Sequence, residues 1–341
     1  METRTLGKTG IQVSVQCLGA MMFGLWGNRD HDDCVTIIHH ALENGINFID
    51  TADVYSHGES EEIVGKALKG RRDDVVLATK VHGQMGEGVN RQGNSRRWIR
   101  YEVEQSLRRL NTDHIDLYQI HRPDPTIDVE ETLSVLTDLV REGKVRAIGS
   151  STFPAEGIVE AQWVAERRGY ERFRCEQPPY SILARGIERA VLPTCERYGM
   201  GVIVWSPLNG GWLTGKYKRG QEYPKGTRAS WGLMDPPEAK HNQRKFDAIE
   251  QLEKVAADAG VSLTHLAIAW SVEHRAVTST IIGPKTKDQL DDLLGAAEVT
   301  LDPATLDRID EIVRPGRTLH APDDGYESPH LAALARRRNS N

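Results

Sequence analysis

The chain is 341 residues long, with 39% hydrophobic and 27% charged residues, a composition that is ordinary for a globular protein. Its net charge of −6 gives no general attraction to nucleic acid. The sequence has neither an N-terminal signal core nor a run of 18 apolar residues, which predicts a cytoplasmic protein that does not enter a membrane. The four cysteines form no CxxC pair and are expected to be reduced core residues: Cys17, Cys34, Cys175 and Cys195.

Apolar periodicity divides the chain into alternating strands and helices. A hairpin with a glycine-rich turn is expected over residues 3–15, and short apolar runs then predict eight strands, at residues 17–20, 46–50, 75–80, 115–121, 145–149, 173–177, 201–205 and 278–282. Amphipathic helices are predicted at residues 31–42, 59–68, 95–110, 129–141, 155–168, 186–198, 243–259 and 263–273, and near 288–294 and 304–313.

This alternation predicts the fold class. Strands that are apolar on both faces, each followed by an amphipathic helix, indicate a parallel sheet covered by helices. Eight such units predict a closed α/β barrel of the (β/α)₈ type, a TIM barrel, with the hairpin at residues 1–16 capping its bottom. An open doubly wound sheet is the alternative, but it usually has fewer strands and often a GxGxxG turn, which the sequence lacks. We therefore expect a single domain, with a long loop at residues 206–242 and a tail at residues 315–341.

Four ionisable side chains follow consecutive predicted strands. Asp50 closes the second strand, Tyr55 lies in the loop after it, and Lys80 and His121 end the next two strands. Because the C-terminal ends of barrel strands share one rim, the four side chains can face one cavity. Each has an ordinary structural explanation by itself, and it is their joint occurrence that predicts an active site.

The four side chains suit the protonation of an oxygen on which negative charge develops. A tyrosine is a weak acid at neutral pH, and a nearby ammonium makes it a better proton donor by stabilising the phenolate. Asp50 would pair with Lys80, and His121 could donate a hydrogen bond to a carbonyl oxygen. Because the set contains no nucleophile–base pair and no metal cluster, we expect a hydride-donating cofactor to supply the electrons.

These residues on a (β/α)₈ pattern resemble the aldo-keto reductase superfamily, closest to the branch that includes bacterial aldo-keto reductases and potassium-channel β subunits. The resemblance runs from Gly19 to about Val299. It rests on these motifs: NFIDTA (residues 47–52) with Tyr55, LATK (77–80), DHIDLY (113–118) with His121, GKVRAIGSS (143–151), WSPL (205–208) with LTGKY (213–217), and Gly283 with Gln289-Leu290.

The resemblance implies a role for each residue. Tyr55 would be the general acid in carbonyl reduction, Asp50 and Lys80 would tune it, and His121 would orient the substrate. The nicotinamide end of the cofactor would be held by Gly19 and Met22, by Ser151, Thr152 and Gln177 at the carboxamide, and by Trp205 stacked on the ring. The pyrophosphate would lie along Ser206, Pro207, Leu208, Gly210 and Lys216, with Arg228 closing over it. The adenosine and its 2′-phosphate would be held by Gly283, Lys285, Gln289 and Asp292. The loop at residues 206–242 would cover the cofactor. Thr152 and Leu293 depart from the family pattern, which often has asparagine or arginine at the first position and asparagine at the second.

Cations near the adenosine end favour NADPH over NADH. Lys216, Arg228, Lys285 and Lys287 could pair with a 2′-phosphate, and no acidic residue is convincingly placed for a 2′-hydroxyl. The expected function is therefore NADPH-dependent reduction of small-molecule aldehydes or ketones. The substrate pocket is expected to be aromatic, which hints at apolar or aromatic carbonyl compounds, with walls from the tail and from Met22, Phe23, Trp26, His82, Trp98 and Trp231.

Other functions are weighed beside this one. The branch with channel subunits leaves a redox-sensing regulatory module with little turnover as an alternative. A barrel hydrolase using Asp50 and Glu176 would leave Lys80 and Tyr55 without a role. The segment 210–216 begins like a P-loop, but Tyr217 stands where a hydroxyl would bind magnesium, so a triphosphatase is not expected. The sequence leaves a homo-oligomer open and does not identify the physiological substrate.

Overall fold

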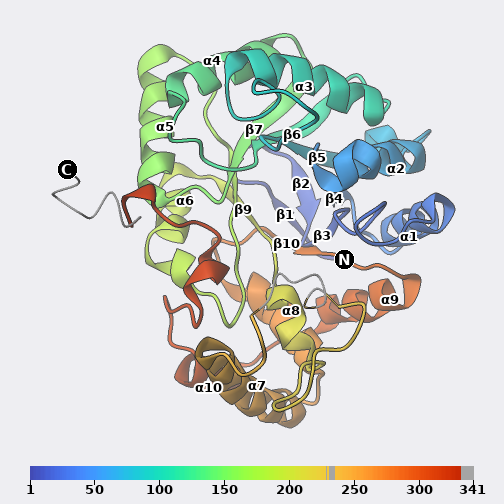
Figure 1. Cartoon of the computed structure of the whole chain (residues 1–341), viewed down its shortest axis with the longest axis vertical. Helices are drawn as coiled ribbons and strands as arrows, with labels where there is room; N and C mark the ends of the chain where they lie inside the picture. The colour runs from blue at the N-terminus through green and yellow to red at the C-terminus, as the bar shows by residue number, and fades with distance from the viewer. Residues whose placement is uncertain (228, 230–234, 332–341) are drawn as a thin grey trace.

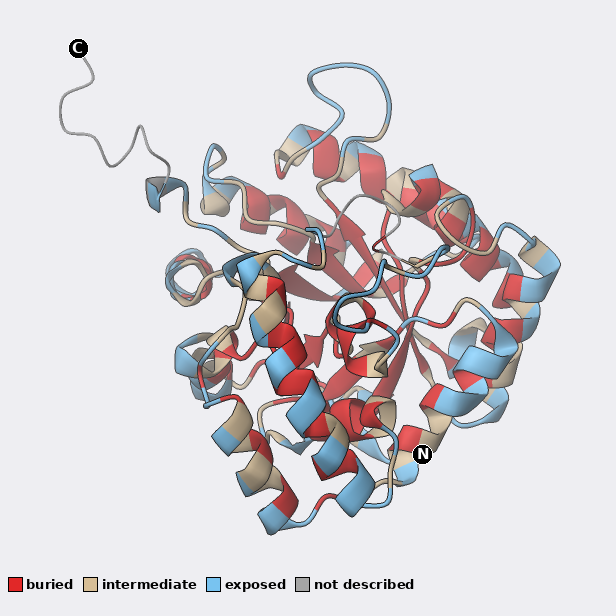
Figure 2. Cartoon of the chain, turned by 60° about the horizontal axis from the view of Figure 1, so that its bottom comes forward, coloured by how far each residue is buried: buried red, intermediate tan, exposed pale blue. Residues whose placement is uncertain are grey.

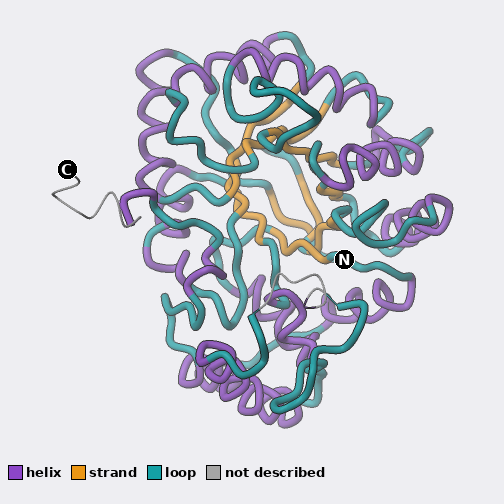
Figure 3. The backbone as a smooth tube through the Cα atoms, viewed as in Figure 1, coloured by secondary structure: helices purple, strands orange, loops and turns teal. Residues whose placement is uncertain are grey.

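The computed structural model describes residues 1–227, 229 and 235–331. Eight parallel strands close into a barrel at the centre of the molecule, and helices surround it (Figure 1, Figure 3). The strands are β3 (Gln16–Gly19), β4 (Phe48–Asp50), β5 (Val76–Val81), β6 (Ile115–Ile120), β7 (Val145–Ser151), β8 (Cys175–Gln177), β9 (Gly201–Val204) and β10 (Ser279–Ile282). Each pairs with the next, and β10 pairs with both β9 and β3, which closes the barrel. The predicted (β/α)₈ barrel is confirmed.

Helices follow the strands as the periodicity predicts. They are α1 (His31–Glu43), α2 (Glu59–Ala67), α3 (Arg96–Arg109), α4 (Val129–Arg141), α5 (Ala155–Arg168), α6 (Val191–Tyr198), α7 (Lys240–Asp258), α8 (Leu263–Glu273), α9 (Lys287–Gly295) and α10 (Pro303–Ile312). Several begin at a side chain that accepts a hydrogen bond from a backbone N–H of the first turn, as Asp30, Ser95, Asp128 and Ser262 do. The helix predicted at residues 186–198 is divided into a 3₁₀ turn, η3 (Gly186–Arg189), and α6, because the backbone of Ala190 is not helical.

The bottom of the barrel is closed by the predicted N-terminal hairpin. Strands β1 (Thr3–Thr5) and β2 (Gln12–Ser14) pair antiparallel. Leu6 and Val13 of this hairpin pack against one buried side chain from each of seven barrel strands: Cys17, Phe48, Ala78, Leu117, Ala147, Cys175 and Ile203. The turn docks closely, since a Cβ atom at Gly7 would lie 2.4 Å from the backbone nitrogen of Gly201.

A larger apolar cluster fills the space between the barrel and the inner faces of the helices, while their outer faces are exposed (Figure 2). All four cysteines are buried and unpaired, as expected for reduced core residues. In the described ranges no single helix is long and apolar enough to cross a membrane, and only the pair α7–α8, bent by 90°, reaches that standard by length and composition.

Candidate active site

The four predicted catalytic side chains meet at the C-terminal rim of the barrel. The Nζ atom of Lys80 donates hydrogen bonds to Oδ2 of Asp50 (2.5 Å), to the carbonyl of Thr51 (2.8 Å) and to the hydroxyl of Tyr55 (3.3 Å). The rings of Tyr55 and His121 meet edge to face, with centroids 5.7 Å apart and planes at 80°. The phenol, ammonium, carboxylate and imidazole therefore form one contiguous group.

Strand alternation and register bring Asp50 and Lys80 together. Phe48 and Ala78 belong to the cluster inside the barrel, and Asp50 and Lys80 each lie two residues further along the same strand. Asp50 is paired in register with Ala78 on the neighbouring strand. Lys80 therefore lies two residues beyond the level of Asp50, on the same side of its strand as Ala78.

A strained turn positions Tyr55. After β4, Ser56 and His57 have left-handed backbones, with φ of 49° and 58°. The Ser56 hydroxyl holds the turn by donating to the carbonyl of Phe23 (3.2 Å) and accepting from the N–H of Trp26 (3.1 Å). The loop after β3 thus fixes the turn that carries the phenol.

Electrostatics keep Lys80 charged although it is completely buried. Burial disfavours the ammonium, but the carboxylate of Asp50 and the hydrogen bonds to Asp50 and Tyr55 outweigh it and raise the pKa of Lys80. Asp50 also accepts hydrogen bonds from the side-chain amides of Gln177 (2.9 Å) and Gln119 (3.2 Å). The carboxylate is therefore fixed by an ammonium and two amides.

His121 has the opposite environment. Burial, followed by the positive charges of Lys80 and Arg122, holds the pKa of His121 well below its usual value. Its backbone N–H donates to the carbonyl of Val81 (3.0 Å), which fixes the main chain of His121 at the end of β6. The imidazole is consequently neutral at physiological pH and can donate a hydrogen bond without carrying charge.

A cavity of about 870 Å³ opens beside these residues. It is lined by Asp50, Tyr55 and His121 of the predicted catalytic set, while Lys80 lies beneath it. It is also lined by most of the predicted cofactor residues: Gly19, Met22, Ser151, Gln177, Trp205, Ser206, Pro207, Leu208, Gly210, Lys216, Gly283, Lys285, Gln289 and Asp292. Leu293 lines it as an apolar wall.

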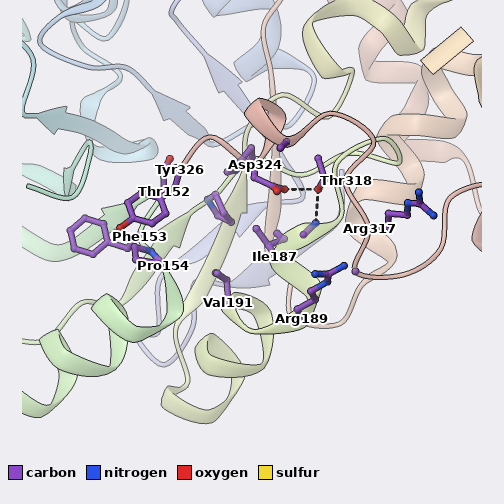
Figure 4. Close-up of a pocket in the computed structure, with 15 residues that line it drawn as sticks. Thr152, Phe153, Pro154, Ile187, Arg189, Val191, Arg317, Thr318, Asp324 and Tyr326 are labelled. Carbon is purple, nitrogen blue, oxygen red and sulfur yellow. Dashed lines mark hydrogen bonds between the residues drawn. The ribbon is translucent and has the colours of Figure 1, made fainter. Parts of the chain in front are cut away.

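One predicted cofactor residue, Arg228, lies outside the described residues, and another is placed differently. Thr152 lines a second cavity, of about 440 Å³, between the ends of β7 and β8 and the C-terminal tail (Figure 4). Its hydroxyl accepts a hydrogen bond from Arg122 (3.1 Å) rather than facing the first cavity.

The loop after β9 is shaped to receive an anion. Ser206, Asn209, Gly210 and Gly211 have left-handed backbones, with φ of 62°, 48°, 68° and 99°. Such turns gather successive N–H groups into a concave surface that favours negative charge. A Cβ atom added at Gly210 or at Gly283 would meet no protein atom within 4 Å, so both backbones border open cavity space. With Lys216 and Lys285 in the wall, the cavity suits a ligand that carries phosphate groups.

The aromatic pocket wall was predicted only in part. Met22 and Trp26 line the cavity, but Phe23 and Trp98 are buried core residues that do not. His82 shares a hydrogen bond with Asn94 (2.9 Å) and does not line it either. Trp231 lies outside the described residues. Aromatic type alone did not distinguish packing beneath a loop from facing the cavity.

Arg122 is a cavity residue that the sequence analysis missed. Its guanidinium lies 5.6 Å from the ring centroid of Trp205, and it donates a hydrogen bond to the carbonyl of His121 (2.7 Å). Burial lowers the pKa of Arg122. Its position directly after His121 at a strand end was the available signal.

Comparisons with known proteins agree with this geometry. The profile of the Aldo/keto reductase family matches residues 17–314. An uncharacterised oxidoreductase of Bacillus subtilis (strain 168), YrpG, is 38% identical over 98% of the chain and all of its own length. A putative voltage-gated potassium channel subunit beta of Schizosaccharomyces pombe is 35% identical over 91% of the chain and 92% of its own. Versiconal hemiacetal acetate reductase of Aspergillus parasiticus is 35% identical over 91% of the chain and 96% of its own.

Proposed function

The chain belongs to the aldo/keto reductase family of oxidoreductases, and from that premise we propose that it is an NADPH-dependent carbonyl reductase in which Tyr55 is the general acid. The observation that carries the proposal is the hydrogen bond from the buried Lys80 ammonium to the Tyr55 hydroxyl, at the wall of a cavity with phosphate-binding features. A bound reduced nicotinamide would supply a hydride to the carbonyl carbon of an aldehyde or ketone.

The protein's own groups would act on the carbonyl oxygen. The neutral imidazole of His121 donates a hydrogen bond that orients this oxygen, and the Tyr55 hydroxyl gives it a proton as negative charge develops. The Lys80 ammonium stabilises the phenolate that remains, and Asp50 holds the ammonium in place. The hydrogen bonds of Lys80 to Asp50 and to Tyr55 hold these groups in place, which lowers the reorganisation needed in the transition state.

The preference for NADPH is supported by charge. Lys216 and Lys285 line the cavity, where a 2′-phosphate and a pyrophosphate would bind. Asp292 also lines it, but its carboxylate already shares a hydrogen bond with His265 (3.0 Å).

The substrate end of the cavity has Met22, Trp26 and Val54, which favours an apolar or aromatic carbonyl compound. One relative is named a reductase of versiconal hemiacetal acetate, which supports the reductive direction. A cytoplasmic location stays a prediction.

The test combines binding and turnover. Fluorescence titration with NADPH and NADH is expected to give tighter binding of NADPH. Loss of reduced-nicotinamide absorbance is then followed with a panel of aromatic aldehydes, aliphatic aldehydes and ketones, and we expect aromatic aldehydes to be reduced. Absence of NADPH binding would overturn the proposal. Tight binding with negligible turnover across the panel would instead favour a regulatory module that senses the cofactor.

A further inference from the structure

A buried ionic cluster connects three distant segments of the chain. Lys245 of α7 has a side chain only 4% exposed, and its Nζ atom lies 2.6 Å from Oδ2 of Asp323 in the C-terminal tail. The same Nζ donates to Oδ1 of Asn209 in the loop after β9 (2.9 Å), and Nδ2 of Asn209 donates to Oδ2 of Asp323 (3.1 Å). The three side chains, which we call the tail latch, therefore bond to one another in a closed triangle.

The tail latch holds the left-handed part of the loop after β9, around Asn209. Asn209 stands between Leu208 and Gly210, which both line the main cavity, and its φ of 48° is uncommon for a residue with a side chain. Such backbone persists only when its surroundings fix it. The side-chain amide of Asn209 has its oxygen and its nitrogen bound by the latch, so the latch supplies that restraint.

The same tail lies against Trp205. A Cβ atom added at Gly325, whose φ is 72°, would be 3.0 Å from Cζ2 of Trp205 and 3.1 Å from Cγ2 of Thr152, so both the close approach and the left-handed backbone favour glycine here. Within the tail, the Thr318 hydroxyl donates to Asp324 (2.5 Å). The same hydroxyl accepts from the backbone N–H of Gly186 (3.0 Å), as the dashed lines in Figure 4 show. The tail is thus tied to α7 through Asp323 and to η3 through Thr318, and Gly325 follows at the wall that carries Trp205.

The latch forms only when all three segments are in place. Burial disfavours the Lys245 ammonium, and Asp323 is its ion-pair partner in the described chain. If the tail moves away, a buried charge loses its carboxylate, and the amide of Asn209 loses an acceptor. Opening of the loop and release of the tail are therefore energetically coupled.

We propose that Lys245 and Asp323 are positioning residues, which hold the loop at residues 206–211 and Trp205 closed so that the tail limits dissociation of a bound dinucleotide. This inference rests on the proposed function for the identity of the ligand. The coupling between the tail and the loop does not depend on a bound ligand. It concerns the rate of cofactor exchange, because neither side chain lines the cavity or reaches the reacting atoms.

The variants separate charge from packing. Asp323→Asn keeps the shape of the side chain and removes its charge, Lys245→Met removes the ammonium, and the double variant removes both charges and leaves no unpaired ion. The matched control is Asp258→Asn, on the same helix, α7, in an exposed pair with Arg308 whose side chains are 63% and 43% exposed. A melting curve of each protein shows that it is folded.

Two readouts test the proposal. Hydrogen exchange of peptides covering residues 206–217 in the cofactor-free protein is expected to be about tenfold faster in all three latch variants than in wild type and the control. The dissociation rate of NADPH, measured by rapid dilution into oxidised cofactor, is expected to rise by about tenfold with little change in the association rate. Unchanged exchange in the folded double variant would overturn the latch. Failure of wild type to bind NADPH would overturn the proposed function, and the exchange readout would still decide the latch.

Discussion

The Nζ atom of Lys80 lies 2.5 Å from Oδ2 of Asp50, and the two side chains are 0% and 3% exposed. Removing the ammonium alone leaves a buried carboxylate without its partner. We predict that Lys80→Met lowers the free energy of unfolding by about 3–5 kcal/mol and abolishes turnover. The double variant Lys80→Met/Asp50→Asn should regain most of the stability and none of the activity. Urea unfolding and NADPH consumption check this, and a double variant that reduces aldehydes would contradict it.

The neutral state of His121 predicts the pH profile. Because its pKa lies well below the usual value, the imidazole does not change charge near neutral pH. We expect kcat/KM for aldehyde reduction to show no inflection near pH ~6.5. His121→Asn should lower kcat/KM by about 10²-fold without changing the shape of the profile in that range. A wild-type inflection there that disappears in the variant would show that the charged imidazole takes part.

Glu176 predicts a pH-dependent stability. Burial raises its pKa from 4.5 to about 7, against the hydrogen bonds from Ser150 and from the backbone of Phe153. Between these two pH values the folded chain keeps a proton on Glu176 that the unfolded chain releases. The stabilising contribution of Glu176 is therefore fully present below pH 4.5 and is lost as the pH rises through about 7.

The magnitude follows from the size of that shift, about 3 kcal/mol of unfolding free energy in total. Glu176→Gln removes this titration, and the Ser150 hydroxyl can rotate to accept from the new amide. The urea midpoint should therefore fall between about pH 5 and about pH 8 by more in wild type than in Glu176→Gln. Parallel shifts of the two proteins would contradict the raised pKa.

Lys285 is predicted to select between the two dinucleotides. Lys285→Ala should weaken NADPH binding by about tenfold and leave NADH binding unchanged, because only NADPH carries the 2′-phosphate. Lys287→Ala is the control, since Lys287 pairs with Asp291 (2.7 Å) on the surface and does not line the cavity. Fluorescence titration of each variant with both dinucleotides gives the ratio. Equal losses for both would place the 2′-phosphate elsewhere.

The sequence predicted what depends on periodicity and on strand ends. The barrel followed from eight apolar runs with amphipathic helices between them, and Asp50, Lys80 and His121 followed from their places at consecutive strand ends. Contacts between distant segments carry no such pattern. Asn209 and Asp323 are 114 residues apart, and nothing local marks them as partners. Phe23 was assigned to the wrong side of its loop for the same reason.

The most direct test of the central claim is aldehyde reduction by Tyr55→Phe. The variant keeps the ring and loses only the proton donor, so NADPH should bind within about twofold of wild type while turnover of a small aromatic aldehyde falls by at least about 10²-fold. Binding by fluorescence and turnover by loss of reduced-nicotinamide absorbance are measured on the same preparation. Full turnover in Tyr55→Phe, with NADPH bound normally, would show that another group protonates the carbonyl oxygen.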